Sequence, residues 1–595
     1  MDQKRLILAA FLSLVVLLAW SYFFQPPKTV PIEAPVVVAE PTTEPDGGAT
    51  AAVGESTETE SVDAATARET IGAEAEQRVE VDTEVGHAVF SNRGAQMLSY
   101  RVNEVTGHDG KPLEMVRARA EGPYPFALTD PSGSALSIND ALFAVEGPER
   151  GPTGISQIVR FEYSGDAGTA TKEFRFLENG LIEVAIHLDG KGPWGVVMGP
   201  GLRNPAPEEL QSKGLFRGAS YLAANELETH QAQKLREEVR VAAGGIRWTA
   251  LEDTYFLSMV APKTPLSAVA MQPFLMTPGA GGAPPTFQPR PPPERITDEL
   301  EDLPQEIRLV LTSQTRDLEA DAYWGAKRYR TLSELPTSYE LTRTIRWGTF
   351  GLIARPMLQL LLWIHDNVVA NYGWAIVILT FVIKLVLLPL THKSYVSMQK
   401  MQKLQPKIEA IKQKHRGKQR DAKGRPNLEG QRKMNEEMQE LFKAEGVNPA
   451  GGCLPLLLQM PVFFAFFALL RNSVELWNAP WLGWIHDLSA ADPWYVLPIV
   501  TGIAQFVQQR MTPATTANPS QRVLLNTMPI WFTVISFGFA SGLVLYWLTN
   551  NLLTIVQQWT YQRLKRAGYL GGPETAPAVG APAARKERAA RVKKR

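Results

Sequence analysis

The chain has 595 residues, which is too long for one ordinary domain. Lys plus Arg and Asp plus Glu both total 61, so the net charge of zero gives no support for a nucleic-acid binder and argues against DNA as a partner. The single cysteine, Cys453, excludes an intramolecular disulfide framework and a cysteine-cluster zinc site. A polar first half precedes a strongly apolar second half, which predicts a membrane protein with a large water-exposed part.

The amino-terminal segment, residues 1–25, is predicted to be an uncleaved transmembrane anchor. Lys4 and Arg5 precede an apolar run of about 19 residues, close to the ~20 that cross a bilayer. A cleaved secretory signal peptide is the alternative, but the run ends in aromatic residues and lacks a small-x-small cleavage site. Residues 26–80 are rich in Pro, Ala, Thr, Glu and Gly, with twelve acidic and three basic residues between 28 and 80, which predicts a disordered acidic tether.

Residues 81–335 are predicted to form one large β-sandwich domain that ends in a helix. Alternating runs that are typical of strands occur at 158–163, 171–176, 181–188 and 307–311. Residues 279–293 are predicted to be a Pro- and Gly-rich loop, and residues 316–335 an amphipathic helix that connects the sandwich to the membrane part.

This domain is not predicted to carry catalysis. Glu183 and His187 lie on one side of a predicted strand, but this pair is more often structural than catalytic, and the domain has no HExxH or other metal-ligand spacing. We therefore expect no enzyme, no cofactor and no metal. A carbohydrate-binding or mutarotase-like module is the main alternative for this domain alone.

The second half is predicted to contain five membrane spans. Residues 336–370 are predicted to include an amphipathic helix in the membrane interface, because the apolar run from 352 to 369 is interrupted by polar residues. The five predicted spans form a helical core over residues 371–565. They lie at about 371–390, 451–471, 494–510, 523–539 and 541–559. With the anchor, this gives a polytopic α-helical membrane protein of six spans and a large extracytoplasmic β domain.

Charge predicts the orientation of these spans. The 391–448 loop has fourteen basic and seven acidic residues, and the 561–595 segment has ten basic and two acidic residues. By the positive-inside rule both are cytoplasmic, together with the amino terminus, and residues 26–345 lie largely outside. Apolar residues at helical spacing predict that 391–448 forms a cytoplasmic helical hairpin on a Met-rich seam. Its basic outer face, like the basic tail 566–595, is suited to anionic lipids, ribosomal RNA or an acidic partner.

Lys384 lies in the middle of the first of these five spans. A lysine at this depth costs about 2.5–3.5 kcal/mol on insertion scales. Thr380 shares its helix face, and the other spans supply amides and hydroxyls but no acidic partner. These polar residues are Gln459, Gln505, Gln508, Gln509, Thr549 and Asn550. The sequence leaves two interpretations open, a hydrated cavity around Lys384 or snorkelling of its side chain to the cytoplasmic head groups.

Four motifs in this half resemble those of one known family. They are Asn448-Pro-Ala-Gly-Gly-Cys-Leu-Pro-Leu-Leu-Leu-Gln-Met-Pro461, Gly542-Leu-Val-Leu-Tyr-Trp547, Trp484-Ile-His-Asp-Leu488 and Thr380-Phe-Val-Ile-Lys-Leu-Val-Leu-Leu-Pro389. Over about residues 340–565 the chain resembles the YidC/Oxa/Alb membrane insertases. The anchor, tether and β domain resemble the Gram-negative YidC branch, whose periplasmic domain is a β-super-sandwich.

The resemblance implies an insertase and chaperone of the inner membrane that acts alone or with the Sec translocon. In the family, five helices enclose a hydrophilic groove that is open to the cytoplasm and to lipid. Lys384 matches the usual groove arginine and keeps its charge but not its planar fork. Thr380 matches a groove threonine, and Trp547 matches an aromatic residue that contacts clients. The other implied groove residues are Gln459, Gln509 and Asn550.

The implied partners are nascent membrane proteins, the Sec translocon, and the ribosome and targeting receptor, the last two through the basic hairpin and tail. Two other classes of membrane protein fit the sequence less well. An intramembrane serine protease could use Ser541, but no histidine lies mid-span to activate it. A secondary transporter should show repeated halves, which the sequence lacks.

Overall fold

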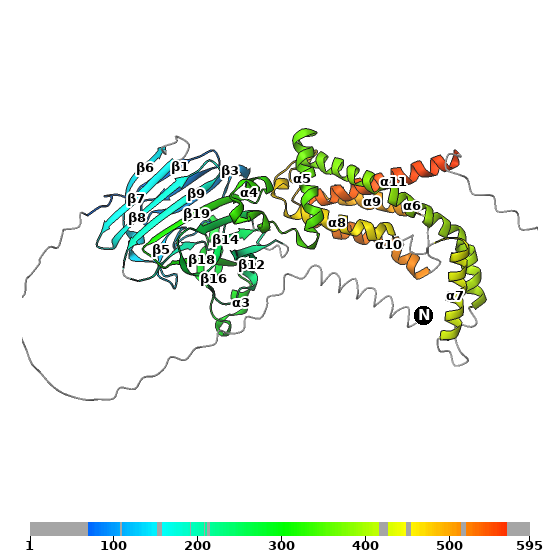
Figure 1. Cartoon of the computed structure of the whole chain (residues 1–595), viewed down its shortest axis with the longest axis horizontal. Coiled ribbons are helices and arrows are strands. Elements are labelled where there is room, and N and C mark those ends of the chain that lie inside the picture. The colour runs from blue at the N-terminus through cyan, green and yellow to red at the C-terminus, as the bar shows by residue number, and fades with distance from the viewer. Residues whose placement is uncertain are drawn as a thin grey trace, which may run out of the picture.

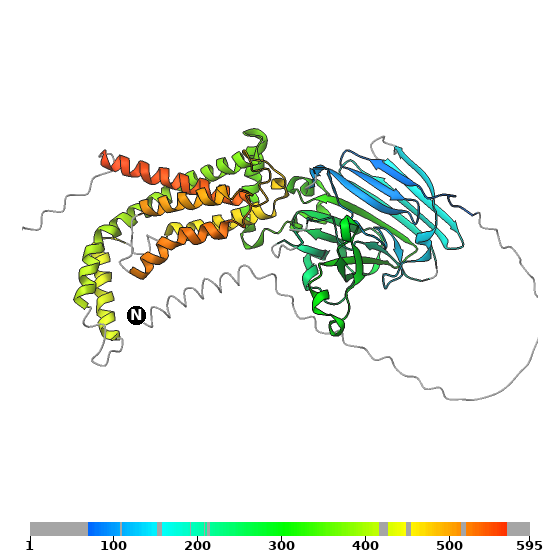
Figure 2. The same cartoon turned by 180° about the vertical axis from the view of Figure 1, so that it is seen from behind.

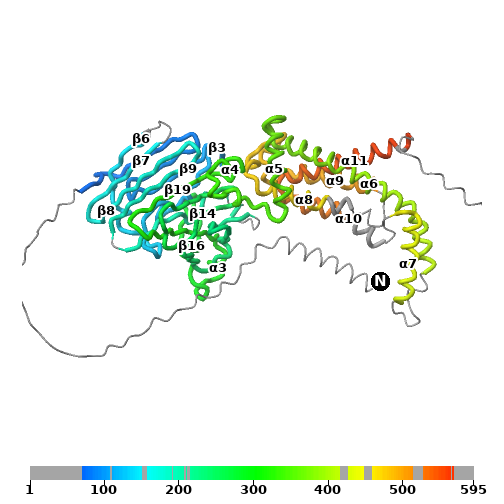
Figure 3. Tube along the Cα trace, viewed as in Figure 1, coloured from blue at the N-terminus to red at the C-terminus, as the bar shows by residue number. Residues whose placement is uncertain are grey.

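The computed structural model describes residues 70–107, 110–150, 157–190, 192–206, 209–210, 215–415, 427–447, 454–512 and 519–567. The predicted anchor (1–25), most of the predicted tether and the tail from residue 568 lie outside these ranges. A β domain forms one end of the molecule and a helical bundle the other (Figures 1 and 2). In the trace of Figure 3, α7 lies at the end of the bundle remote from the β domain.

The β domain contains three antiparallel sheets. The first, in the order β1-β2-β3-β4, consists of β1 (Arg78–Asp82), β2 (Gly86–Ser91), β3 (Gln96–Thr106) and β4 (Pro112–Glu114). The second, in the order β13-β16-β18-β10-β5 with β17 beside β16, consists of β5 (Leu128–Thr129), β10 (Trp194–Met198), β13 (Val239–Ala242), β16 (Leu266–Thr277), β17 (Thr286–Pro289) and β18 (Gln305–Ser313). The third, in the order β12-β11-β14-β15-β19-β9-β8-β7-β6, consists of β6 (Ala144–Arg150), β7 (Gln157–Gly165), β8 (Gly168–Phe176), β9 (Leu181–Asp189), β11 (Arg217–Ala223), β12 (Glu226–Gln231), β14 (Ile246–Asp253), β15 (Phe256–Pro262) and β19 (Asp317–Ala326).

Aromatic side chains hold the first and third sheets together. Phe90 of β2 packs against Phe174 of β8 with 4.6 Å between ring centroids. Phe126 lies 5.0 Å from Phe174 and 5.4 Å from Trp324 of β19. In β8 every second residue is buried, so its inward face joins this core while its other face stays more open to solvent. The core therefore follows from the two-residue period of the strands.

Three sequence predictions for this domain are wrong in detail. Residues 317–326, predicted as part of a helix over 316–335, form β19, and only the short α4 (Tyr329–Glu334) follows it. β19 lies between β15 and β9, and its apolar residues Leu318, Ala320, Ala322 and Trp324 recur at every second position, which is the period of a strand rather than of a helix. The predicted loop 279–293 contains β17, which pairs with β16. The end of the predicted tether belongs to the β domain, because Ile71 bridges to Ser164 and β1 begins before residue 80.

Seven helices follow the β domain in the described part of the chain. They are α5 (Gly351–Asn367), α6 (Tyr372–His415), α7 (Leu428–Ala444), α8 (Leu454–Asn472), α9 (Val496–Met511), α10 (Pro519–Ser536) and α11 (Ser541–Arg566). A short helix, α3 (Asp298–Glu301), precedes them in the β domain. Within the described ranges, α6 alone is long and apolar enough to cross a membrane unaided, and Thr527–Ser536 is a shorter apolar stretch.

α6 is one continuous helix through the predicted span and the first arm of the predicted hairpin. It continues past Pro389 and Pro406, which remove single backbone donors but do not end it. Its second half packs against α7 through a small apolar cluster, and this contact is supported by an ion pair of 2.6 Å between Lys407 and Glu445. The cluster consists of Met401, Leu404, Ile408, Met438, Leu441, Phe442 and Val447.

The segment between α8 and α9 contacts the β domain. Trp477 is 8% exposed, and its Nε1 donates to the Thr106 carbonyl at 3.1 Å. Its ring lies 5.1 Å from Tyr255 and 5.4 Å from Phe256, both of the β domain. The Arg203 guanidinium lies over the Phe256 and Trp477 rings, at 4.9 and 5.1 Å. The bundle and the β domain therefore share a packed aromatic contact.

Candidate functional site

A polar contact joins α6 to α11 at Lys384. Lys384 Nζ donates to Asn550 Oδ1 at 2.9 Å and to Thr554 Oγ1 at 2.7 Å. Asn550 and Thr554 are four residues apart, so one face of α11 presents both acceptors to the same ammonium group. Lys384 is thus held by neutral oxygen atoms, one from an amide and one from a hydroxyl.

Two cavities meet at Lys384. The smaller one, here called the inner cavity, has a volume of about 20 Å³, which is room for about one water molecule. It is lined by Thr380, Ile383, Lys384, Leu387, Thr391, Gln459, Val462, Phe466, Tyr546 and Asn550. Thr380 is buried here, and its hydroxyl donates to the Ile376 carbonyl of its own helix at 2.7 Å.

The larger cavity, here called the wide cleft, has a volume of about 780 Å³. It is lined mainly by residues 381–398 of α6 and by the second half of α11, which points away from the β domain (Figure 1). Its polar lining consists of Lys384, Thr391, His392, Gln459, Gln508, Thr512, Thr554, Gln557, Gln558, Thr560 and Tyr561. Its apolar lining consists of Phe381, Leu385, Leu388, Pro389, Met398, Leu553, Val556 and Leu564. Among the described residues, no Asp or Glu lines either cavity.

Four of the six predicted groove residues lie together, and two do not. Lys384, Thr380, Gln459 and Asn550 line the inner cavity. The other two residues, Gln509 and Trp547, line neither cavity. Trp547 packs instead in an aromatic cluster, with ring centroids 5.0 Å from Phe463, 3.5 Å from Phe532 and 6.3 Å from Phe539.

Sequence reasoning missed several polar residues of the wide cleft. Thr554, which binds Lys384 directly, was not predicted, although it lies one turn after Asn550 on the same helix face. Gln557 and Gln558 were also missed, and they donate to the hydroxyls of Thr391 at 3.2 Å and Thr512 at 3.1 Å. A polar stripe at helical spacing along α11 was the signal that could have found them.

The polar residues of the β domain face structural partners. His187 Nδ1 lies 2.6 Å from Asp317 Oδ1 on the neighbouring strand, whereas Glu183 pairs with Arg175 and Lys263. Glu183 and His187 therefore do not form a catalytic pair. In the described part of the chain, no group of three His, Cys, Asp or Glu side chains could hold a metal ion.

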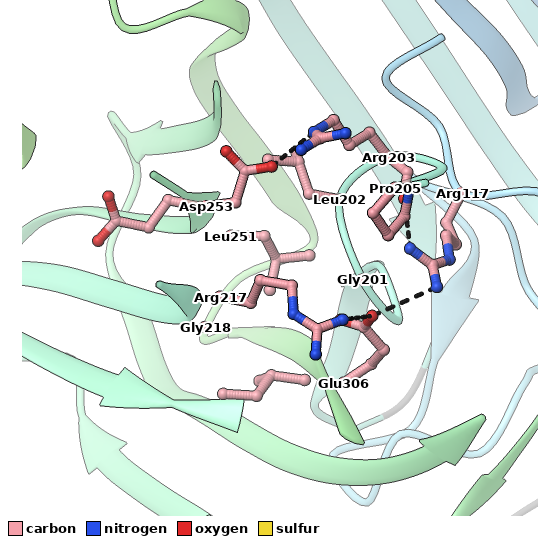
Figure 4. A pocket seen from close by; sticks show the side chains of 12 residues that line it. Arg117, Gly201, Leu202, Arg203, Pro205, Arg217, Gly218, Leu251, Asp253 and Glu306 are labelled. Atoms are coloured by element: carbon pink, nitrogen blue, oxygen red, sulfur yellow. Dashed lines mark hydrogen bonds and ion pairs between the residues drawn. The ribbon is translucent and has the colours of Figure 1, made fainter. Parts of the chain in front are cut away.

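The β domain also contains a buried ionic cluster around a small cavity (Figure 4). Arg203 Nε pairs with Asp253 at 2.6 Å, and Glu306 lies between Arg117 at 3.4 Å and Arg217 at 3.3 Å. The cavity holds only about 20 Å³, so there is room for about one water molecule but not for an organic ligand. Because Arg203 also stacks on Trp477, this cluster supports the contact with the bundle.

Ser541 does not resemble an activated nucleophile. Its Oγ is buried and has no hydrogen-bond partner among the described residues. A serine nucleophile needs a base within hydrogen-bond reach. The arrangement of the bundle therefore gives no support for proteolysis.

Comparisons with known proteins agree with the motifs. The family model described as 60Kd inner membrane protein matches residues 363–567, and the one described as YidC periplasmic domain matches residues 78–360. The membrane protein insertase YidC of Nitratidesulfovibrio vulgaris is 33% identical over 580 residues, which covers 94% of this chain and 99% of the relative. That of Citrifermentans bemidjiense is 34% identical over 592 residues, with 93% and 98% coverage.

Solved structures give weaker likenesses. A crystal structure of an active YidC insertase with its first transmembrane domain resolved is 20% identical at a TM-score of 0.33, covering 82% of this chain and 94% of that one. YidC from Thermotoga maritima is 16% identical at a TM-score of 0.29, covering 82% and 99%. A galactose mutarotase-like protein from Lactobacillus casei covers 42% of this chain and 100% of its own, with 11% identity and a TM-score of 0.23.

Both family models together span most of the chain, and the relatives match it almost end to end. The family models and relatives describe an inner-membrane insertase with a periplasmic domain. This agrees with the observed apolar helical bundle, its polar cavities and the large β domain. The chain therefore belongs to the YidC family of membrane protein insertases, inner-membrane proteins with a periplasmic domain that insert nascent membrane proteins and are not enzymes.

Proposed function

We propose that Lys384 is the client-attracting charge of a hydrophilic groove formed by Thr380, Lys384, Gln459 and Asn550. The observation that carries this proposal is that Lys384 is bound by an amide and a hydroxyl oxygen rather than by a carboxylate. Its positive charge is therefore not cancelled by a neighbour and is available to an acidic residue of a client.

The physical basis of insertion is then simple. A lysine at this depth costs about 2.5–3.5 kcal/mol unless it is hydrated or paired. Opposite charges at 4 Å attract by about 4 kcal/mol at an effective dielectric constant near 20. The attraction to Lys384 would therefore offset part of the free energy that an acidic residue of a client loses when it leaves water. The apolar helix of the client meanwhile partitions into lipid at about 25 cal/mol per Å² of buried surface.

The same proposal includes a six-span topology with both termini in the cytoplasm and residues 26–345 largely periplasmic. It is supported by the basic 391–448 loop and basic tail, and by the position of α7 at the end of the bundle opposite the β domain. These basic segments are proposed to meet the ribosome, the targeting receptor and anionic lipids, and the Sec translocon is a proposed partner. Trp547 is proposed to contact clients from its aromatic cluster, and Gln509 is left outside the groove.

The experiment measures insertion of a single-span client with zero to three acidic residues in its translocated tail. Lys384→Arg should insert all clients, because it keeps the charge. Lys384→Ala should lose more activity as acidic residues are added, and Lys384→Glu should lose most, because attraction becomes repulsion. Arg355→Ala is the matched control, since Arg355 is an exposed cation on α5 away from both cavities. If Lys384→Ala inserts every client as well as the parent, Lys384 is a snorkelling anchor and the proposal is wrong.

A further inference from the structure

The wide cleft combines a polar depth with an apolar rim that is open at the surface. Five of its apolar side chains are between 40% and 57% exposed even though they line a cavity. They are Phe381, Leu385, Leu388, Val556 and Leu564. Exposed side chains of this kind on two diverging helices form a surface on which a long apolar chain can lie. The rim alone fits any hydrocarbon, so the polar depth must identify the ligand.

The polar depth is positively charged and contains no acid. Lys384 lies where the cleft meets the inner cavity, and the exposed His392 lies beside Tyr561, with 5.5 Å between ring centroids. The remaining polar lining residues are amides and hydroxyls, which can donate hydrogen bonds to an anion. Asn550 and Thr554 engage two of the three ammonium donors of Lys384. A cation in this setting favours a counter-anion with oxygen acceptors, because no described lining residue supplies one.

We propose that, between clients, the wide cleft binds one acidic phospholipid, with its phosphate at Lys384 and an acyl chain along the rim. The lipid comes from the leaflet remote from the β domain, which is the cytoplasmic one. Lys384 lies about 9 Å along the helix from Leu390, and the polar walls allow a hydrated head group to reach that depth. This inference rests on the proposed function, because the acidic residues of a client then displace the phosphate from Lys384.

The test uses the full chain in bilayer nanodiscs that contain a photoactivatable phosphatidylglycerol or the matching phosphatidylcholine. Crosslinked peptides are identified by mass spectrometry. We expect phosphatidylglycerol to label residues 381–398 and 553–564 about fivefold more than phosphatidylcholine, the effect of about one cation near an acidic lipid. Lys384→Met, which keeps a long unbranched side chain, should remove this preference. Equal labelling by the two lipids would overturn the proposal.

A second variant protects the test against a folding defect at Lys384. Val556→Glu places a negative charge on the exposed rim of the cleft and should also lower the phosphatidylglycerol preference. Leu552→Glu is the matched control, because Leu552 is 47% exposed on the same helix but does not line the cleft. A fall for Leu552→Glu as large as for Val556→Glu would contradict a specific site.

Two outcomes separate this inference from the proposed function. If Lys384→Met loses the lipid preference but inserts acidic clients normally, the proposed function is wrong and the lipid site stands. If Lys384→Met inserts acidic clients poorly but keeps the lipid preference, the lipid site is wrong and the proposed function stands. A client peptide with an acidic tail should reduce phosphatidylglycerol labelling in the parent, whereas a neutral one should not. Equal labelling with both peptides would refute the displacement.

Discussion

Truncating Trp477 tests how much its aromatic contact stabilises the junction between the β domain and the bundle. Trp477→Ala removes a buried indole from between Tyr255, Phe256 and Arg203. An aromatic side chain that buries about 150–250 Å² at about 25 cal/mol per Å² contributes roughly 4–6 kcal/mol. This is close to the ~3–5 kcal/mol that such truncations cost in protein cores. The change also leaves the Thr106 carbonyl without the indole donor.

Hydrogen exchange of the full chain measures this loss as local opening. When the exchange rate follows the opening equilibrium, a loss of about 3–5 kcal/mol accelerates exchange roughly a hundredfold to several thousandfold. The faster exchange should appear in peptides that cover 473–479 and 253–257, and not in α11. Trp494→Ala is the control, because Trp494 is 66% exposed in the same segment between α8 and α9. If exchange in both stretches changes by less than about threefold, the contact is held by other groups and the reasoning is refuted.

Three further predictions concern topology, the hairpin and pH. External protease on spheroplasts should remove the β domain and spare residues 391–448, and cleavage of that loop from outside would contradict the six-span topology. Replacing residues 400–440 by a short linker should leave a stable membrane protein, because the hairpin packs on its own apolar cluster. The shortened protein should nevertheless fail to insert clients, and unchanged insertion would show that the hairpin is misassigned. Burial raises the pKa of Glu475, in η10 (Val474–Leu476), above its ordinary value of 4.5, because it disfavours the charged carboxylate. The protonated form therefore stabilises the fold. This stabilisation is complete below pH 4.5 and is lost as the pH rises through the raised pKa. Glu475→Gln keeps an acceptor for the Tyr329 amide and should raise the melting temperature of the full chain near neutral pH but not near pH 4.

Local pattern was enough to find several strands of the β domain. The runs 158–163, 171–176, 181–188 and 307–311 lie in β7, β8, β9 and β18, as predicted. The prediction failed at β19, because it joined this strand to the helical residues of α4, although Leu318, Ala320, Ala322 and Trp324 recur at every second position. It also failed to join the first arm of the hairpin to α6, because Pro389 indicates a helix end, whereas the structure tolerates it inside the helix.

The candidate site was predictable in composition but not in detail. The absence of acidic residues from the spans indicated that Lys384 would have amides and hydroxyls as neighbours, and in the structure Lys384 contacts one of each. Whether Thr554 contacts Lys384 depends on how α11 is rotated toward α6. Lys384 and Thr554 are 170 positions apart in the chain, so the sequence does not show this contact. Periodicity defines the faces of each helix but not which faces meet. Trp547 illustrates the same limit, since its aromatic neighbours come from α8, α10 and the turn before α11.

The geometry at Lys384 gives a physical reason for lysine rather than arginine at this position. The two acceptors, Asn550 Oδ1 and Thr554 Oγ1, are single oxygen atoms one helical turn apart, and an ammonium group can point separate N–H bonds at both. A guanidinium has its donors in one plane and suits two oxygen atoms of one carboxylate or phosphate better. Lysine is therefore held by α11 while it keeps a donor for an anion. Arginine would keep the charge at Lys384, but its planar donors match these two separate acceptors less well.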